Sequence, residues 1–150
     1  MKELLRKFKR LSSVLKVRKL HTQEIAMELK TATDERDQVI SELNRQQNLY
    51  LKGVTDINQK RQSTQRAGLD LLETYVESVK NEWIALYRKK QELDRQIPII
   101  AQSLSYALKQ IEIIEKFRTE NKDARNLFIE KKTQEELDFL FSVKNQKGRT

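Results

Sequence analysis

The chain has 150 residues, of which 35% are charged and 37% are hydrophobic, with three glycines, one proline and no cysteine. This composition is typical of long helices, because the residues that interrupt helices are almost absent. The lack of cysteine excludes disulfides and thiolate metal sites, and no apolar run reaches the roughly 18 residues needed to cross a membrane. Charges are scattered through the first twenty residues, so we expect no secretory signal and a cytoplasmic location.

The net charge of +8 is concentrated at the two ends of the chain. Residues 1–20 hold eight Lys/Arg and one Glu, and residues 116–150 hold nine Lys/Arg and six Asp/Glu. Residues 21–115 carry a net charge of −2. If the ends of the chain meet in space, one end of the molecule is strongly basic.

Apolar residues recur every 3.5 positions in the first third of the chain. Steps of four and three residues from Leu4 to Tyr50 reach 14 positions, of which ten are apolar. This spacing, kept in phase, is typical of a helix that packs along a partner helix. The pattern predicts a first helix over about 3–58, although Gly53 should weaken its end.

A polar segment follows, over about 59–68, and it ends in Gly68. Glycine is the usual residue where a helix stops or the chain reverses. A turn at this place predicts an antiparallel two-helix hairpin. The alternative is one continuous helix of nearly 150 residues that dimerises in parallel; the polar segment favours the hairpin.

A second periodic stretch runs from Leu72 to Phe128 and predicts a helix over about 69–143, followed by a disordered tail over 144–150. Thirteen of its 17 seam positions are apolar. Pro98 lies within it and should kink the helix, because proline cannot donate the helical hydrogen bond. Polar residues occupy successive seam positions at Arg118, Asn121 and Arg125, which predicts that the partner helix ends there. The expected fold is all-α, a single antiparallel coiled-coil hairpin of rod shape, with the second helix longer.

The sequence predicts no catalytic residues, no cofactor and no metal site. His21 is the single histidine, and acidic pairs such as Glu135–Glu136 lie among basic residues. Catalysis by paired carboxylates needs a concave site with restricted water, which two helices do not form. We therefore expect a protein that is not an enzyme and that binds no small molecule.

The basic N-terminal segment has three interpretations. It could bind nucleic acid through phosphates, but it lacks interleaved aromatic residues and any known basic motif. It could lie on an anionic membrane, but its apolar residues are in phase with the helix seam. It could also dock into an acidic cavity of another protein.

Two segments at opposite ends resemble the FliJ family, the small coiled-coil proteins of bacterial flagellar export. One is Phe8-Lys-Arg-Leu-Ser-Ser-Val-Leu-Lys-Val-Arg-Lys19, and the other is Ala107-Leu-Lys-Gln-Ile-Glu-Ile-Ile-Glu-Lys-Phe-Arg118. Glu130-Lys-Lys-Thr-Gln-Glu-Glu-Leu-Asp-Phe139 is similar to the closing pattern of the family, and Gly68-Leu69 with Tyr75, Val76 and Val79 is similar to its second-helix start. The resemblance covers nearly the whole chain.

The resemblance implies an antiparallel coiled coil similar to the central stalk of rotary ATPases. The end with both termini would enter the hexameric flagellar export ATPase and promote assembly of its ring. The end near the turn would contact the export-gate membrane protein, and export chaperones would also bind. The protein would lie in the cytoplasm, peripheral to the inner membrane through the export apparatus, without inserting into the membrane and without binding nucleic acid.

Two surfaces follow from this reading. For contact with the ATPase ring we expect the basic residues Arg6, Lys7, Lys9, Arg10, Lys16, Arg18, Lys19, Lys122 and Arg125. The resemblance places the export-gate contact at Val39, Leu43, Gln46, Tyr50, Tyr75, Val79, Glu82 and Leu86, most of which the seam also claims for the helix interface. The alternatives are the equivalent (YscO-like) stalk protein of an injectisome, or a coiled-coil scaffold or nucleic-acid-associated protein.

Overall fold

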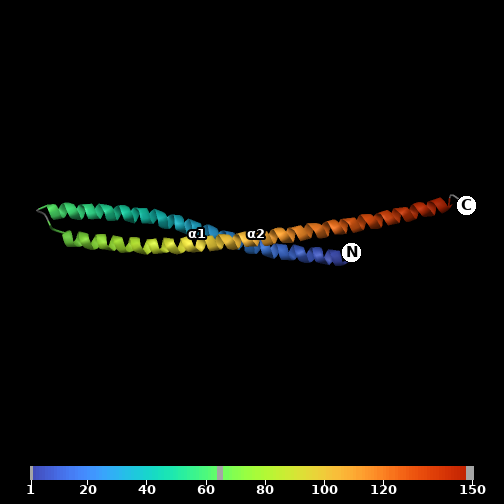
Figure 1. Ribbon diagram of the computed structural model, residues 1–150, viewed down its shortest axis with the longest axis horizontal. Helices are drawn as coiled ribbons and strands as arrows, with labels where there is room; N and C mark the ends of the chain where they lie inside the picture. The colour runs from blue at the N-terminus through green and yellow to red at the C-terminus, as the bar shows by residue number, and fades with distance from the viewer. Residues whose placement is uncertain (1, 64–65, 148–150) are drawn as a thin grey trace. The chain divides into compact units, whose positions relative to one another are not determined.

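A computed structural model of the chain describes residues 2–63 and 66–147. In these residues it contains two helices and no strand: α1 spans Lys2–Gln62 and α2 spans Leu69–Lys147. The helices pack against each other as a hairpin, which confirms the predicted all-α fold (Figure 1). The second helix is the longer one, with 79 residues against 61.

The helix ends differ from the expected ones. Helix α1 continues from residue 58 to Gln62, and residues 144–147 are helical although they were expected in a disordered tail. The cause is composition: Gln, Lys and Arg at these positions are good helix formers, and Lys60 and Arg61 also complement the partial negative charge at the end of α1. Residues 64–65 of the expected turn and 148–150 of the expected tail lie outside the described residues.

Gly68 is the last residue before α2, at the end of the turn, where the sequence places it. Gly68 has a φ of 80°, in the left-handed region that favours glycine. Its carbonyl accepts the first hydrogen bond of α2, from the Leu72 amide at 3.0 Å. Asp70 lies in the first turn of α2, where its charge favours the helix N-terminus.

The chain divides into two compact units, each formed by parts of both helices. One, which we name the turn unit, comprises Ile25–Ser103; the other, the terminal unit, comprises Met1–Glu24 and Leu104–Thr150. In the turn unit, α1 and α2 lie side by side on either side of the chain reversal (Figure 1).

The core of the turn unit is a thin line of seam residues. Val39, Leu43 and Leu93 are buried together, and Trp83, Leu86 and Ile97 pack against them. Ion pairs flank this line: Lys89 Nζ lies 2.9 Å from Glu35 Oε1, and Arg36 Nε lies 2.6 Å from Asp94 Oδ1. These pairs join α1 to α2 at the edges of the apolar seam.

Gly53 brings the two helices close together. A Cβ atom at this position would overlap Cγ2 of Val76 on α2. Both residues are buried. The glycine, which the sequence marks only as a weak point of α1, therefore allows close packing of the helices.

Helix α2 continues without interruption through Pro98. Proline has no amide hydrogen, so the Asp94 carbonyl lacks its usual helical donor at this position. The expected kink stays a prediction.

Candidate interaction surfaces

The terminal unit carries the basic surface that the sequence predicts. Eight of the nine residues expected to contact the ATPase ring are exposed; they are Arg6, Lys7, Lys9, Arg10, Lys16, Arg18, Lys19 and Lys122. Lys19 also pairs with Glu115 of α2 at 3.3 Å. The other side chains of this set remain open to solvent on helices that the seam holds in place.

Arg125, the ninth residue, packs within the protein. Its guanidinium carbon lies 5.3 Å from the centre of the Phe8 ring, and that of Arg118 lies 5.1 Å from the same centre. Arg125 Nε is buried without a hydrogen-bond partner in the described part of the chain. Two guanidinium groups that contact one ring are a cation–π arrangement, which stabilises the pairing of α1 with α2.

Asn121 also binds α1. It is 6% exposed, and its side-chain amide donates a hydrogen bond to the Leu4 carbonyl at 3.0 Å. The sequence interpretation was therefore wrong on one point: Arg118, Asn121 and Arg125 lie where the partner helix ends, but they are not free of it. These polar residues pair with the first turns of α1, and residues 126–147 extend beyond that pairing (Figure 1).

A shallow cavity lies beside Phe8, lined by Glu115, Arg118, Thr119 and Lys122, with a volume of about 370 Å³. Two of these residues are cationic, and Thr119 bonds the Glu115 carbonyl with its hydroxyl group. The lining therefore combines two cationic side chains with the carboxylate of Glu115, and Arg118 also lies over the Phe8 ring.

The residues expected at the export gate lie in the turn unit, in two environments. Tyr75 and Glu82 are exposed, and Tyr50 and Leu86 are half-buried. The other four, Val39, Leu43, Gln46 and Val79, are buried at the helix interface. These four hold α1 and α2 together, so they are not accessible to another protein in this structure.

An apolar groove lies beside Tyr50, one of the half-buried members of this set. It has a volume of about 320 Å³, and Tyr50, Leu51, Trp83 and Ile84 line it together with Gln47 and Lys80. Trp83 stacks on Tyr87, with ring centres 5.4 Å apart and an angle of 11° between the planes. Aromatic side chains at a partly open groove are typical anchors for a protein partner.

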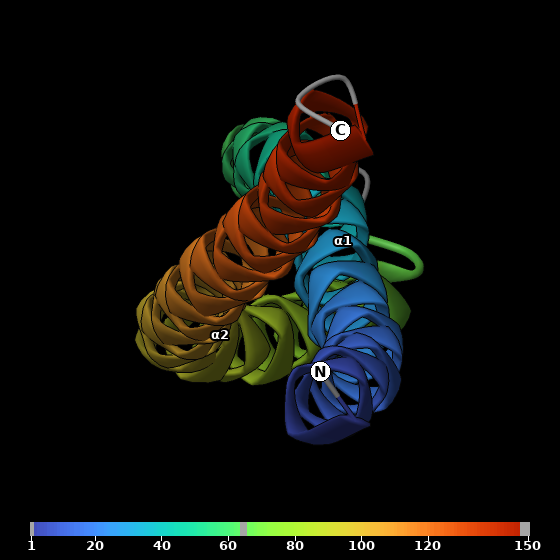
Figure 2. The same ribbon diagram turned by 90° about the vertical axis from the view of Figure 1, so that its right-hand side faces the viewer.

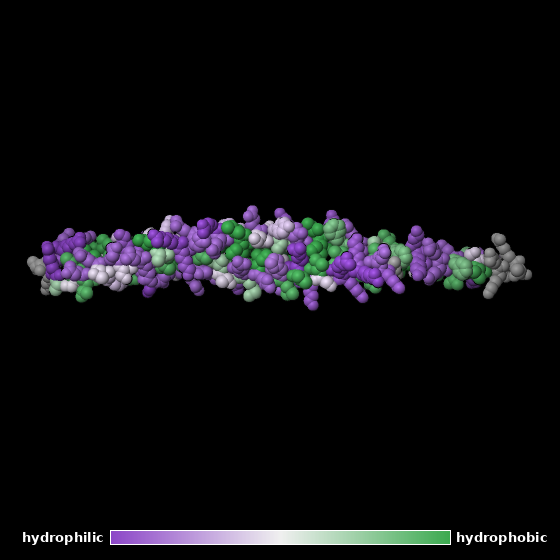
Figure 3. Space-filling model, turned by 90° about the horizontal axis from the view of Figure 1, so that it is seen from below, coloured by the Kyte–Doolittle hydropathy of each residue, from purple (hydrophilic) through white to green (hydrophobic). Residues whose placement is uncertain are grey.

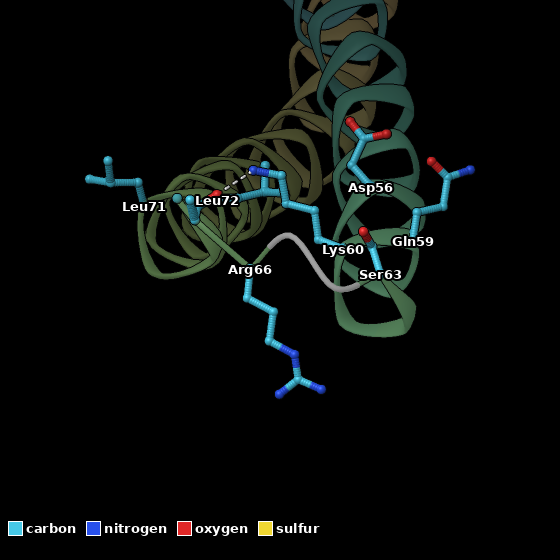
Figure 4. A pocket seen from close by; sticks show the side chains of 9 residues that line it. Asp56, Gln59, Lys60, Ser63, Arg66, Leu71 and Leu72 are labelled. Atoms are coloured by element: carbon cyan, nitrogen blue, oxygen red, sulfur yellow. Dashed lines mark hydrogen bonds between the residues drawn. The ribbon is translucent and has the colours of Figure 1, made fainter.

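The turn borders an open cavity of about 1100 Å³, which is larger and more polar than the groove beside Tyr50 (Figure 4). Lys60 crosses it and donates a hydrogen bond to the Ala67 carbonyl at 2.8 Å, while Leu71 points away. Arg61 pairs with Glu73 at 2.8 Å on the same end of the unit. The cationic groups here hold the turn closed, which is a structural role.

Electrostatic effects on the carboxyl groups are local. Hydrogen bonds from Gln46 and Arg45 lower the pKa of Glu42. A hydrogen bond from Lys90 at 2.9 Å, together with the charge of Arg36, lowers the pKa of Asp94.

In the described residues no group of three or more His, Asp or Glu could hold a metal ion, and no helix is long and apolar enough to cross a membrane.

Comparisons with protein-family models, with curated proteins and with solved structures found no match to the chain.

Proposed function

We propose that the chain is the stalk-like coiled-coil component of a bacterial flagellar export apparatus, without enzymatic activity of its own. In this proposal the terminal unit enters the ring of the hexameric export ATPase, and the turn unit contacts the export gate. The protein works at the cytoplasmic face of the inner membrane, where it promotes ring assembly and couples the ATPase to the gate.

One observation carries the proposal: in the terminal unit, the paired parts of α1 and α2 present eight exposed cationic side chains. Within it, Arg118, Asn121 and Arg125 fasten the first turns of α1 to α2. The basic segment is therefore helical and packed against α2. A firm surface loses little conformational entropy when it docks.

Charge would set the rate of docking. A cationic surface that meets an acidic cavity is attracted over a Debye length, which raises the association rate and makes it dependent on salt. The same attraction would orient the terminal unit relative to the ring before close contact forms. In the turn unit, Tyr75, Glu82 and the groove beside Tyr50 offer an accessible surface for the gate.

The proposal is tested with the export ATPase of the same bacterium, by following hexamer formation and ATP hydrolysis at increasing ionic strength. The variant Lys7→Glu/Arg10→Glu/Lys16→Glu should slow association with the ATPase by at least about tenfold at low salt, because it reverses the charge that attracts the ring. Stimulation of ATP hydrolysis should fall in parallel.

A matched control carries the same change of charge in the turn unit: Lys30→Glu/Lys52→Glu/Arg88→Glu, three exposed positions. This control should stimulate the ATPase within about twofold of the unchanged chain, since its substitutions lie outside the proposed contact. Equal losses in both variants, or no stimulation by the unchanged chain at low salt, would refute insertion of the terminal unit.

A further inference from the structure

In the terminal unit, α2 carries a second row of residues with coiled-coil spacing, beside the row that packs on α1. The second row lies one residue before successive seam positions and keeps the same steps of four and three. We name it the second seam; its members are Tyr106, Gln110, Ile113, Phe117, Glu120 and Ala124. Gln110 is half-buried and the other five are exposed. The exposed fractions of Tyr106, Ile113 and Phe117 are 65%, 47% and 55%.

The second seam faces a direction about 100° away from α1, because successive residues of a helix are rotated by that angle. Figure 2 shows α1 on one side of this part of α2, which is drawn in orange, and Figure 3 shows apolar patches between hydrophilic ones on the surface. A helix within a bundle contacts two neighbours and therefore needs two adjacent apolar rows. The second seam thus continues the interface with α1 and has the position of a contact with a further helix.

We propose that the further helix is the same part of α2 in a second copy of the chain, antiparallel to the first. In this register Ile113 lies opposite Phe117 of the second copy, Tyr106 lies opposite Ala124, and Gln110 lies opposite Glu120. Apolar members therefore meet apolar members, a large ring meets a small side chain, and the Gln110 amide can donate a hydrogen bond to the Glu120 carboxylate. Each pair occurs twice, because the interface is isologous.

Charged residues along one edge of the second seam fit the same register. Lys109, Lys116 and Asp123 each precede a member of the seam by one residue, and all three are exposed. In an antiparallel pair this edge meets the same edge of the second copy, which brings Lys109 opposite Asp123. Lys116 lies at the two-fold axis opposite its own counterpart, and its charge is offset by Glu112 and Glu120, which are four residues away on either side.

Other arrangements of the two helices bring unfavourable pairs together. A parallel pair in register would place Glu120 against Glu120 in the seam, which is repulsive. An antiparallel pair shifted by one heptad in one direction would place Lys109 against Lys116, and a shift in the other direction would place Phe117 against Glu120. A polar pair such as Gln110 with Glu120 is a device that specifies register in coiled coils.

The exposed side chains indicate a small and reversible interface. An aromatic side chain buries about 150–250 Å² in a protein interior. Tyr106 and Phe117 of both copies are more than half exposed, so covering these four rings would remove on the order of 400 Å² from water, and Ile113 adds to this area. An interface of this size is typical of weak association. The dimer should therefore form at high protein concentration.

The test measures the mass of the full chain by sedimentation equilibrium, up to the highest concentration that stays in solution and with no other protein present. The inference goes beyond the proposed function and does not rest on it, because the ATPase is absent. A dimer is expected. Phe117→Lys should weaken it by at least about tenfold, because each copy would then bury an ammonium group against Ile113 of the other.

The matched control is Leu108→Lys. Leu108 is 51% exposed in the same unit but lies outside the second seam, so this variant should leave the dimer within about twofold. Circular dichroism checks that both variants keep their helix content. A chain that stays monomeric at every concentration would overturn the proposal and leave the second seam to a helix of another protein. Equal weakening by the two variants would overturn it as well.

The charged edge is tested by exchanging its charges. Lys109→Glu should weaken the dimer about threefold to tenfold, because two attractive pairs with Asp123 become repulsive. Adding Asp123→Lys to the same chain should restore it, because the exchanged charges are again complementary and the net charge returns to its original value. A double variant no stronger than Lys109→Glu alone would contradict the register.

Orientation is tested by cysteine cross-linking, since the chain has no cysteine of its own. Chains with Tyr106→Cys mixed with chains with Ala124→Cys should form a disulfide between copies on mild oxidation. Tyr106→Cys by itself should not, because the two cysteines would lie about 27 Å apart along the helix, far beyond disulfide reach. Efficient cross-linking of Tyr106→Cys to itself would show parallel pairing and overturn the antiparallel arrangement.

Discussion

Gly53 shows how one residue sets the local spacing of the helices. Replacing it by alanine should gain about 1 kcal/mol in helix propensity but lose more through overlap with Val76 Cγ2, since overpacking typically costs about 1–3 kcal/mol. We expect Gly53→Ala to lower the free energy of unfolding by about 1–2 kcal/mol, as measured by urea denaturation.

The exposed neighbour Thr55→Ala serves as the control and should be near neutral. Val76→Ala removes the overlapping methyl group. The free energy of unfolding lost in the double variant Gly53→Ala/Val76→Ala should therefore be smaller than the sum of the losses in the two single variants. Simple additivity, or a gain in stability from Gly53→Ala alone, would contradict the packing role of the glycine.

Asp94 provides a dependence on acid at a single residue. Its folded-state pKa is lowered, first by the hydrogen bond from Lys90 and then by Arg36. A lowered folded pKa means that the stabilisation is complete above the ordinary aspartate pKa of about 3.9 and is lost as pH falls through the lower folded value. The stability of the chain should therefore decrease below about pH 4, in part through this residue.

We expect Asp94→Asn to be less stable than the unchanged chain at pH 7 and to approach it as the pH falls through the lowered folded-state pKa of Asp94, where the carboxylate becomes protonated. Urea denaturation midpoints across this pH range provide the measurement. Asp37→Asn, at an exposed position, is the control and should run parallel to the unchanged chain. A constant difference for Asp94→Asn at every pH would show that charge is not the cause.

At the scale of the element, the Asn121 side chain joins the two helices of the terminal unit through its hydrogen bond to the Leu4 carbonyl. A buried amide at a seam position specifies register, and usually at some cost in stability. Because the Leu4 carbonyl can still accept its own helical hydrogen bond, Asn121→Leu should leave no unsatisfied group. It should therefore be at least as stable as the unchanged chain, by about 0–2 kcal/mol, but less specific in register.

The measurement is disulfide trapping between Leu4→Cys and cysteines placed one at a time near residue 121 and one helical turn to either side. With Asn121 in place, one level should dominate; with leucine, neighbouring levels should also be trapped. Asn121→Ala, which loses the hydrogen bond without adding apolar volume, should lower stability by about 1 kcal/mol. A single dominant level with leucine would assign the register to the apolar seam alone.

At the scale of the whole molecule, the 3.5-residue spacing predicted the hairpin and the interface because burial follows the seam. Leu15, Val39 and Val79 are among the buried residues, and even the polar seam residues Thr22 and Gln46 are buried. A periodic pattern identifies the face of each helix, and one glycine in a polar segment identifies the reversal.

The pattern could not predict how polar residues at a seam would be used. At Arg118 and Arg125 the guanidinium groups contact Phe8, and at Asn121 the amide reaches a backbone carbonyl, so the pairing continues where apolar periodicity ends. Such contacts depend on which side chain lies opposite, which spacing alone does not specify. The role of Gly53 was hidden for the same reason, because it depends on Val76.

Because Leu4 and Phe8 contact α2, truncation should affect the terminal unit differently at its two ends. Removing the first eight residues would take away the ring between Arg118 and Arg125 and the carbonyl that binds Asn121. Cutting after Arg125 would leave all these contacts in place, because the residues beyond it are exposed up to 142. Shortening the chain at its N-terminal side therefore removes contacts between α1 and α2, whereas shortening it at its C-terminal side does not. A fusion partner or a label should be attached at the C-terminal side.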